Sequence, residues 1–151
     1  MKIRDFLKIK GRPVITIGPN ETLSSAIEKL VDNDIGALPV CNEKDVLVGI
    51  ISERDLLKEC LQRSSILGNT KVQDAMTKSV AVGTPEDDLD YATSAMKQKR
   101  IRHLPIVVDQ KLEGIISIRD IVSFQLEETK AQIRYVGLLP GRTHFGRQRL
   151  V

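Results

Sequence analysis

Residues 49–55 read GIISERD, and residues 114–120 read GIISIRD. Upstream of each copy stands a second shared stretch, LPV at residues 38–40 and LPI at residues 104–106. The LP pairs lie 66 residues apart and the GIIS stretches 65 apart, since the second intervening turn is one residue shorter. Three more residues match at the 66-residue offset: Pro19, Leu23 and Ala26 meet Pro85, Leu89 and Ala92. The differences in length fall between the shared stretches, so the chain is an internal duplication.

The first half of each copy predicts a strand followed by a helix. A short β-rich run, at residues 14–17 and 80–82, ends at a turn that contains proline. The apolar spacing that follows predicts an amphipathic helix in both copies. We expect Thr22 to be the N-cap of that helix in the first copy and Asp88 in the second, because both side chains can accept hydrogen bonds from helix amides.

The second half of each copy predicts a hairpin followed by another helix. In the first copy, the apolar runs 38–41 and 46–51 flank a polar turn, as in an antiparallel hairpin. The next helix begins after Ser52, and its counterpart after Ser117, with the serine as the cap. The order is therefore β-α-β-β-α, and such a unit has an apolar sheet face that it cannot bury alone.

We therefore predict an α/β (α+β) fold in which the two repeats pack as a pseudo-two-fold pair around a shared core, with the sheets facing and the helices outside. The predicted boundaries are residues 1–66 for the first repeat and 67–129 for the second. Residues 130–151 are expected to hold the end of the last helix and a basic, flexible tail.

The composition is that of a soluble globular protein, with 41% hydrophobic and 28% charged residues. The longest apolar run, residues 46–51, is far shorter than the roughly 20 residues needed to cross a bilayer. Residues 1–5 do not resemble a signal peptide, so we expect a cytoplasmic protein. Cys41 and Cys60 form no CxxC motif and lie near no histidine, so we predict buried small side chains and no metal site or disulfide.

The positive charge is concentrated at the C-terminal end. Residues 130–151 hold five cations and no acidic residue, so a chain of net charge +3 carries −2 over residues 1–129. The folded body therefore lacks the basic surface expected of a nucleic-acid-binding protein. An aromatic content of 3%, with no tryptophan, also argues against a platform for stacking bases. Nucleic acid is an unlikely partner of this body.

The repeated GIIS-x-RD stretch has the chemistry of a ligand site at a strand-to-helix junction. Its glycine lets a ligand approach the backbone, and its serine hydroxyl and first helix amides present donors to an anionic oxygen. Asp55 or Asp120, one helical turn later, suits the paired hydroxyls of a ribose, and Arg54 or Arg119 can reach a phosphate. The same Ser-x-x-Asp pattern is also a common helix cap, and a duplicated cap would repeat equally.

Together these motifs resemble a tandem pair of CBS domains, also called a Bateman module, over residues 3–125. The resemblance rests on PNETL at 19–23, GALPV at 36–40, GIISERD at 49–55 and their partners in the second repeat. It implies a non-catalytic regulatory, energy-sensing module that binds an adenosine-containing ligand between the repeats. The ligand class is AMP, ADP or ATP, with Mg²⁺ accompanying ATP, or else NAD or S-adenosylmethionine. It further implies a homodimer that signals to an unknown protein partner by conformational change.

By that resemblance, Asp55 and Asp120 hold ribose hydroxyls, and Ser52 and Ser117 contact phosphate or ribose. The adenine slot is expected to be lined by backbone and apolar groups of six residues: Thr16, Ile17, Ile35, Ala37, Ala81 and Val82. The second repeat has Arg102 and His103 where the first has Gly36 and Ala37, just before Pro105 and its counterpart Pro39. We therefore expect one strong phosphate pocket around Arg102, His103 and either Arg119 or Arg54. A purely structural role for His103 stays open.

An enzyme is not expected. His103 and His144 are the only histidines, and the sequence has no GxSxG, HExxH, Walker A or GxGxxG motif. We therefore assign no catalytic residue, no metal site and no catalytic cofactor. Two alternatives to a ligand sensor stay open: an inert dimerisation scaffold, and a protein that binds nucleic acid or a membrane surface through its basic residues 130–149.

Overall fold

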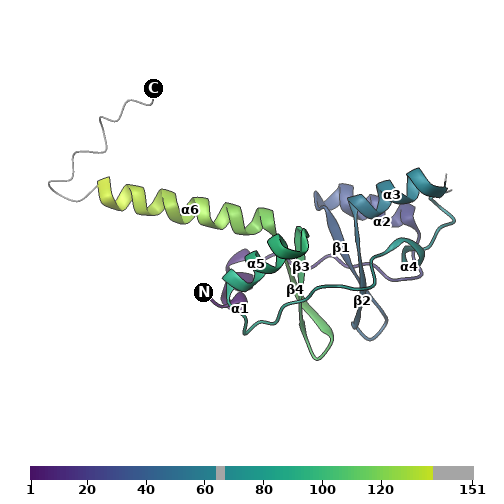
Figure 1. Cartoon of the computed structure of the whole chain (residues 1–151), viewed down its shortest axis with the longest axis horizontal. Helices are drawn as coiled ribbons and strands as arrows, with labels where there is room; N and C mark the ends of the chain where they lie inside the picture. The colour runs from purple at the N-terminus through teal and green to yellow at the C-terminus, as the bar shows by residue number, and fades with distance from the viewer. Residues whose placement is uncertain (64–66, 138–151) are drawn as a thin grey trace, which may run out of the picture.

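A computed structural model describes residues 1–63 and 67–137, which form two similar α+β units side by side (Figure 1). The helices are α1 (Ile3–Lys10), α2 (Leu23–Asn33), α3 (Glu53–Arg63), α4 (Val72–Ala75), α5 (Leu89–Lys99) and α6 (Ile118–Gly137). The strands are β1 (Ala37–Cys41), β2 (Leu47–Ser52), β3 (His103–Val108) and β4 (Lys111–Ser117). The predicted tail beyond residue 137 lies outside the described residues.

Both predicted hairpins are confirmed. β1 pairs antiparallel with β2, and β3 with β4, in equivalent registers that place Ala37 opposite Ser52 and His103 opposite Ser117. Each register shifts by one residue near the far end of the first strand, between Val40 and Cys41 and at the equivalent point of β3. The matching irregularity shows that the duplication extends to backbone detail.

The predicted β-runs at residues 14–17 and 80–82 are not strands. Each copy makes a single parallel bridge instead, Ile17 with Val40 and Gly83 with Ile106. Two backbone hydrogen bonds fix each bridge; in the first copy the Ile17 amide donates to the Pro39 carbonyl, and the Cys41 amide donates to the Ile17 carbonyl. Proline follows two residues after each bridge, and it cannot donate a further ladder hydrogen bond. The pairing therefore ends at once.

The helix starts were predicted correctly, although one cap differs. The Ser25 amide donates to Thr22 Oγ1 at 3.2 Å, so Thr22 caps α2 as expected. Asp88 stands at the N-cap position of α5, but its side chain makes no capping hydrogen bond. Its carboxylate pairs with Lys2 at 3.2 Å instead, because the start of α1 lies alongside. The prediction of Asp88 as a side-chain cap is therefore wrong.

The two units exchange their opening helices. Ile3 and Phe6 of α1 are buried with Leu104 and Ile116 of the second hairpin, whereas Val72 of α4 is buried in the core of the first. Figure 1 shows α1 beside α5 and α4 beside β2. The buried side chains therefore form two cores, one per unit, and the predicted single shared core is incorrect. The units are held together by the chain that crosses between them as well as by side-chain contacts.

The hairpin turns also join the units. Val46 and Lys111 form an antiparallel bridge, with the Leu47 amide donating to the Gln110 carbonyl at 3.0 Å. The hairpins stand side by side in the middle of the molecule, with helices on their outer sides, as predicted (Figure 1). Within residues 1–63 and 67–137, no helix has the length and apolarity to cross a membrane.

The cysteine prediction holds only in part. Cys41 is half-buried at the end of β1, but Cys60 is exposed on α3. The buried side of α3 centres on Leu56 and Glu59, whereas Cys60 and the next residue, Leu61, are both exposed. The prediction of a buried Cys60 is therefore wrong.

Candidate functional site

The hairpin registers assemble the predicted site residues into two equivalent corners. The first corner consists of Gly36, Ala37, Ser52, Arg54 and Asp55; the second consists of Arg102, His103, Ser117, Arg119 and Asp120. In the first, the Gly36 carbonyl accepts a hydrogen bond from the Glu53 amide at 3.1 Å; in the second, the Arg102 carbonyl accepts one from the Ile118 amide at 2.9 Å. These bonds fix the start of each strand against the start of the following helix.

In both corners the serine and aspartate cap the helix reciprocally. The Ser52 amide donates to Asp55 Oδ2 at 2.9 Å, and the Asp55 amide donates to Ser52 Oγ at 3.3 Å. The second corner repeats this, at 2.9 Å from the Ser117 amide and 3.0 Å from the Asp120 amide. The capping interpretation is thus correct for both copies. An ionised carboxylate accepts about four hydrogen bonds, so capping alone leaves acceptor capacity for a ligand.

The remaining partner of each carboxylate differs between the corners. Thr77 Oγ1 donates to Asp55 Oδ1 at 3.1 Å, and Thr77 is exposed. Lys10 Nζ lies 2.8 Å from Asp120 Oδ2 and also donates to the Ile115 carbonyl at 2.7 Å. Sequence reasoning missed Lys10 and Thr77. Lys10 is the last residue of α1 and Thr77 lies two residues after α4, but nothing local in the sequence reveals that those helices change units.

Burial and charge act together on the second corner. Burial by itself raises the pKa of the Asp120 carboxyl, but hydrogen bonds from Lys10 and the Ser117 amide outweigh it and hold that pKa below its ordinary value. Burial lowers the pKa of His103, against the opposing effect of the Asp120 and Glu53 carboxylates. The structure therefore favours an ionised Asp120 beside a neutral His103.

The two corners meet at His103. A Cβ atom added to Gly36 would lie 3.3 Å from His103 Cε1, and 3.8 Å from Glu53 Oε1. The imidazole of the second corner thus lies against the glycine of the first. A larger residue at position 36 would clash with this ring. The glycine of the first corner, opposite the histidine of the second, therefore allows the two corners to approach each other.

The lowered pKa of His103 predicts a loss of stability in mild acid. The unfolded chain binds a proton near the ordinary pKa of 6.5 and the folded chain only at lower pH, so the unfolded state binds more protons between the two values. The contribution of the neutral His103 to the free energy of unfolding is therefore complete above pH 6.5, and it decreases as the pH falls below that value. Urea unfolding at about pH 7.5 and about pH 5.5 should show a smaller acid loss for His103→Gln than for the wild type. Equal losses in the two proteins would contradict the assignment; His144 is common to both and cancels.

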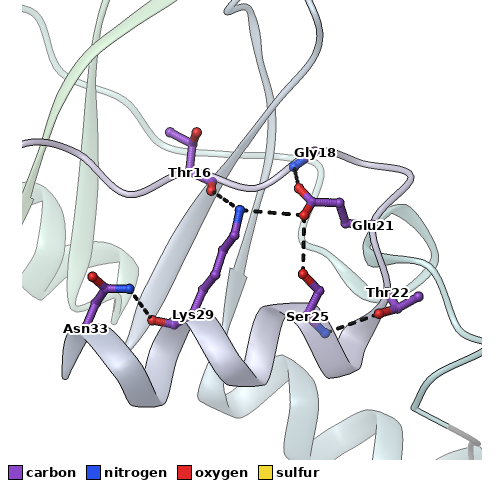
Figure 2. A network of polar contacts seen from close by, with 7 residues as sticks. All are labelled: Thr16, Gly18, Glu21, Thr22, Ser25, Lys29 and Asn33. Atoms are coloured by element: carbon purple, nitrogen blue, oxygen red, sulfur yellow. Dashed lines mark hydrogen bonds and ion pairs between the residues drawn. The ribbon is translucent and has the colours of Figure 1, made fainter.

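Two adenine-slot residues of the first repeat, Thr16 and Ile17, lie along the edge of β1 that β2 does not pair. Thr16 is next to the Ile17 bridge, and its carbonyl accepts a hydrogen bond from Lys29 Nζ at 3.0 Å (Figure 2). Lys29 also lies 3.6 Å from Glu21 Oε1, and Glu21 Oε2 accepts a bond from the Gly18 amide at 2.6 Å. That amide bond is the main reason the pKa of Glu21 is lowered. The network holds this segment against α2.

The second repeat secures the equivalent carbonyl with a different donor. Tyr91 Oη donates to the Val82 carbonyl at 3.4 Å, from the helix that corresponds to α2. The amide of the next residue, Gly83, donates to the Pro105 carbonyl, which joins this segment to β3. Pro105 is buried. Ile35 is half-buried against the core of the first unit. These residues offer apolar and backbone groups and no charged side chain.

The three predicted phosphate-binding arginines, Arg54, Arg102 and Arg119, are exposed. A cavity of about 410 Å³ lies elsewhere, at the opposite end of β1 from the first corner. It is lined by Gly18, Pro19, Asn20, Glu21, Cys41, Asn42 and Glu43, which include none of the predicted site residues. Its two carboxylates make it unsuited to a phosphate. No cluster of three or more potential metal ligands occurs in the part of the chain that the structure describes.

Comparison with known proteins supports the assignment of both repeats. The CBS domain family model matches residues 3–62 and again residues 72–127. The chain is 31% identical over 140 residues to the CBS domain-containing protein CBSX3, mitochondrial, of Arabidopsis thaliana, covering 87% of this chain and 68% of that protein. It is 34% identical over 119 residues to the CBS domain-containing protein YhcV of Bacillus subtilis, covering 78% of this chain and 83% of that protein.

Solved structures show the same architecture. The CBS-domain containing protein ATU1752 from Agrobacterium tumefaciens matches with a TM-score of 0.76 and 34% identity, over 83% of this chain and 99% of that one. The CBS domain pair of protein MJ0100, solved in complex with 5′-methylthioadenosine and S-adenosyl-L-methionine, matches with a TM-score of 0.74 and 27% identity, over 85% of this chain and 98% of that one. The chain therefore belongs to the CBS-domain family and carries two CBS domains, at residues 3–62 and 72–127.

Proposed function

We propose that the chain is a non-catalytic regulatory module that binds an adenosine-containing ligand at the two corners and signals its presence to a protein partner. The observation that carries the proposal is the meeting of the corners at His103 and Gly36, each corner with a carboxylate on the first turn of a helix. The structural relative solved with 5′-methylthioadenosine and S-adenosyl-L-methionine supports the ligand class.

Each part of such a ligand has a matching group. A ribose hydroxyl can donate to Asp55 in place of the exposed Thr77 hydroxyl, since both are neutral donors to the same carboxylate. Phosphate groups suit Arg102 and Arg119, which give the second corner its positive charge. The neutral His103 can add one hydrogen bond. The adenine ring suits the half-buried side chain of Ile35, whereas the side chain of Ile17 is 2% exposed and belongs to the core. These chemical matches support an adenosine-containing ligand.

Signalling follows from where the corners lie. They belong to different units, and His103 of one touches Gly36 of the other. A ligand that contacts both units favours one relative arrangement of the units over others, in proportion to its difference in affinity for them. A partner protein that contacts both units would detect this shift in population.

A calorimetric ligand panel tests the proposal. AMP, ADP, ATP with and without Mg²⁺, NAD, S-adenosylmethionine and 5′-methylthioadenosine are titrated into the protein, with GMP as the control. We expect saturable binding of at least one adenosine-containing ligand and clearly weaker binding of GMP. Absence of binding throughout the panel would contradict the proposal and favour an inert scaffold, and equal binding of GMP would contradict adenosine selectivity.

We also propose that the module forms a homodimer through α3 and α6. Leu57 and Leu61 of α3 are 71% and 86% exposed, and Val122 and Leu126, their equivalents on α6, are 46% and 55% exposed. A second copy presents the same two apolar patches, so it can cover both by two-fold pairing. We expect Leu61→Glu combined with Leu126→Glu to convert a dimer into a monomer in sedimentation velocity, whereas Val108→Glu, an exposed control on β3, leaves the dimer intact. A monomeric wild type would contradict the proposal.

A further inference from the structure

The two corners differ most in the group that each aspartate already contacts. Asp55 accepts a bond from the hydroxyl of Thr77, an exposed and uncharged side chain. Asp120 is paired at 2.8 Å with the ammonium group of Lys10, and the two side chains are only 17% and 22% exposed. Lys10 also donates to the Ile115 carbonyl at 2.7 Å, which fixes its position beside the carboxylate.

We infer that Lys10 is an internal occupant of the second corner, so that a nucleoside ligand fills the first corner before the second. The inference rests on the proposed function and adds to it an order of occupancy and the residue that sets this order. Lys10 acts through Asp120, by holding the carboxylate that a ribose would otherwise contact.

The inference follows from what a ribose hydroxyl must displace in each corner. In the first, it replaces the Thr77 hydroxyl, and one neutral donor is exchanged for another at Asp55 Oδ1. In the second, it must compete with an ammonium group for a carboxylate in surroundings largely closed to water. Separating such a pair leaves two poorly hydrated charges, which is more costly than breaking an exposed hydrogen bond.

Withdrawal of Lys10 would also involve the exchanged helix. Lys10 is the last residue of α1, which is anchored in the core of the second unit by Ile3 and Phe6. Gly11 follows in the left-handed conformation, with φ of 60°, and the chain then crosses to Thr16 and Ile17 of the first unit. Filling the second corner therefore acts, through Lys10, on the segment that connects α1 to the first unit.

Lys10→Met tests the inference, because it removes the ammonium group and keeps an unbranched apolar stem. The control is Lys8→Met, at an exposed position on the same helix. The probe is 5′-methylthioadenosine, which carries no phosphate, so a general loss of positive charge affects it little. Stoichiometry and affinity are measured by calorimetry, with circular dichroism to establish that each variant is folded.

We expect one stronger and one weaker binding step for the wild type and for Lys8→Met. In Lys10→Met the weaker step should strengthen by at least about tenfold, the effect of one hydrogen bond to a charged group. Should Lys10→Met fail to fold, Lys10→Gln replaces it, since glutamine retains a donor for the Ile115 carbonyl without the charge.

The outcomes separate this inference from the proposed function. A second step that is unchanged or weaker in Lys10→Met overturns the inference and leaves the proposed function in place. Two binding steps of equal affinity in the wild type likewise overturn the inference and leave the proposed function in place. Binding to Lys10→Met alone also overturns the inference, because the first corner of the wild type would then bind nothing. Absence of binding to every variant overturns both the inference and the proposed function.

Discussion

Replacing Phe6 by alanine is expected to lower the free energy of unfolding by about 3–5 kcal/mol. Phe6 is 2% exposed, and it packs in the core of the second unit although it lies at the start of the first repeat. Its ring meets that of Phe124 edge to face, with centroids 5.4 Å apart. The substitution therefore removes a large buried side chain, opens a cavity and removes one of the two buried anchors of α1.

Urea denaturation followed by circular dichroism measures this effect. The matched control is Ile9→Ala on the same helix, where the side chain is 59% exposed and the expected change is within about 0.5 kcal/mol. A loss for Phe6→Ala no larger than that of the control would show that α1 is not docked on the second unit. The exchange of helices would then be incorrect.

The second large effect is on ligand affinity. We expect Asp55→Asn to weaken binding of 5′-methylthioadenosine by about 10- to 100-fold, because a hydrogen bond to a carboxylate is replaced by one to a neutral amide. Asparagine still offers an oxygen to the Ser52 amide, so the cap of α3 is retained. The loss should therefore appear in affinity and not in folding.

Calorimetry of the folded variants measures this loss. Asp32→Asn, at an exposed position on α2, removes the same charge away from both corners and should bind like the wild type. Asp120→Asn should change only the weaker step, since the first ligand occupies the other corner. A dissociation constant for Asp55→Asn within about twofold of the wild type would remove Asp55 from the binding site.

The sequence alone predicted those features that local physics determines. The hairpins follow from apolar runs around short polar turns, and the helix starts from Thr22, Ser52 and Ser117. The duplicated stretch also predicted a strand-to-helix junction in each repeat, where the strand register brings Ala37 to Ser52 and His103 to Ser117. Each of these depends on residues less than about 20 positions apart.

The features that were missed depend on contacts distant in the sequence. Asp88 was expected to cap α5, but Lys2 takes its carboxylate from 86 positions earlier. The partnership of Lys10 with Asp120 spans the two repeats, and it exists only because α1 crosses to the second unit. Residue spacing within one repeat carries no signal for such an exchange, so the asymmetry of the two corners was visible only at Arg102 and His103.

The location of the bound ligand tests the account most directly. Amide chemical shifts are followed by two-dimensional NMR while 5′-methylthioadenosine is added, and the site is read from the residues that respond. We predict the largest changes at Gly36, Ser52 and Asp55, with little change around the cavity near Asn20 and Asn42. Changes confined to that cavity, with Ser52 and Ser117 unaffected, would contradict the claim that the paired corners bind the nucleoside.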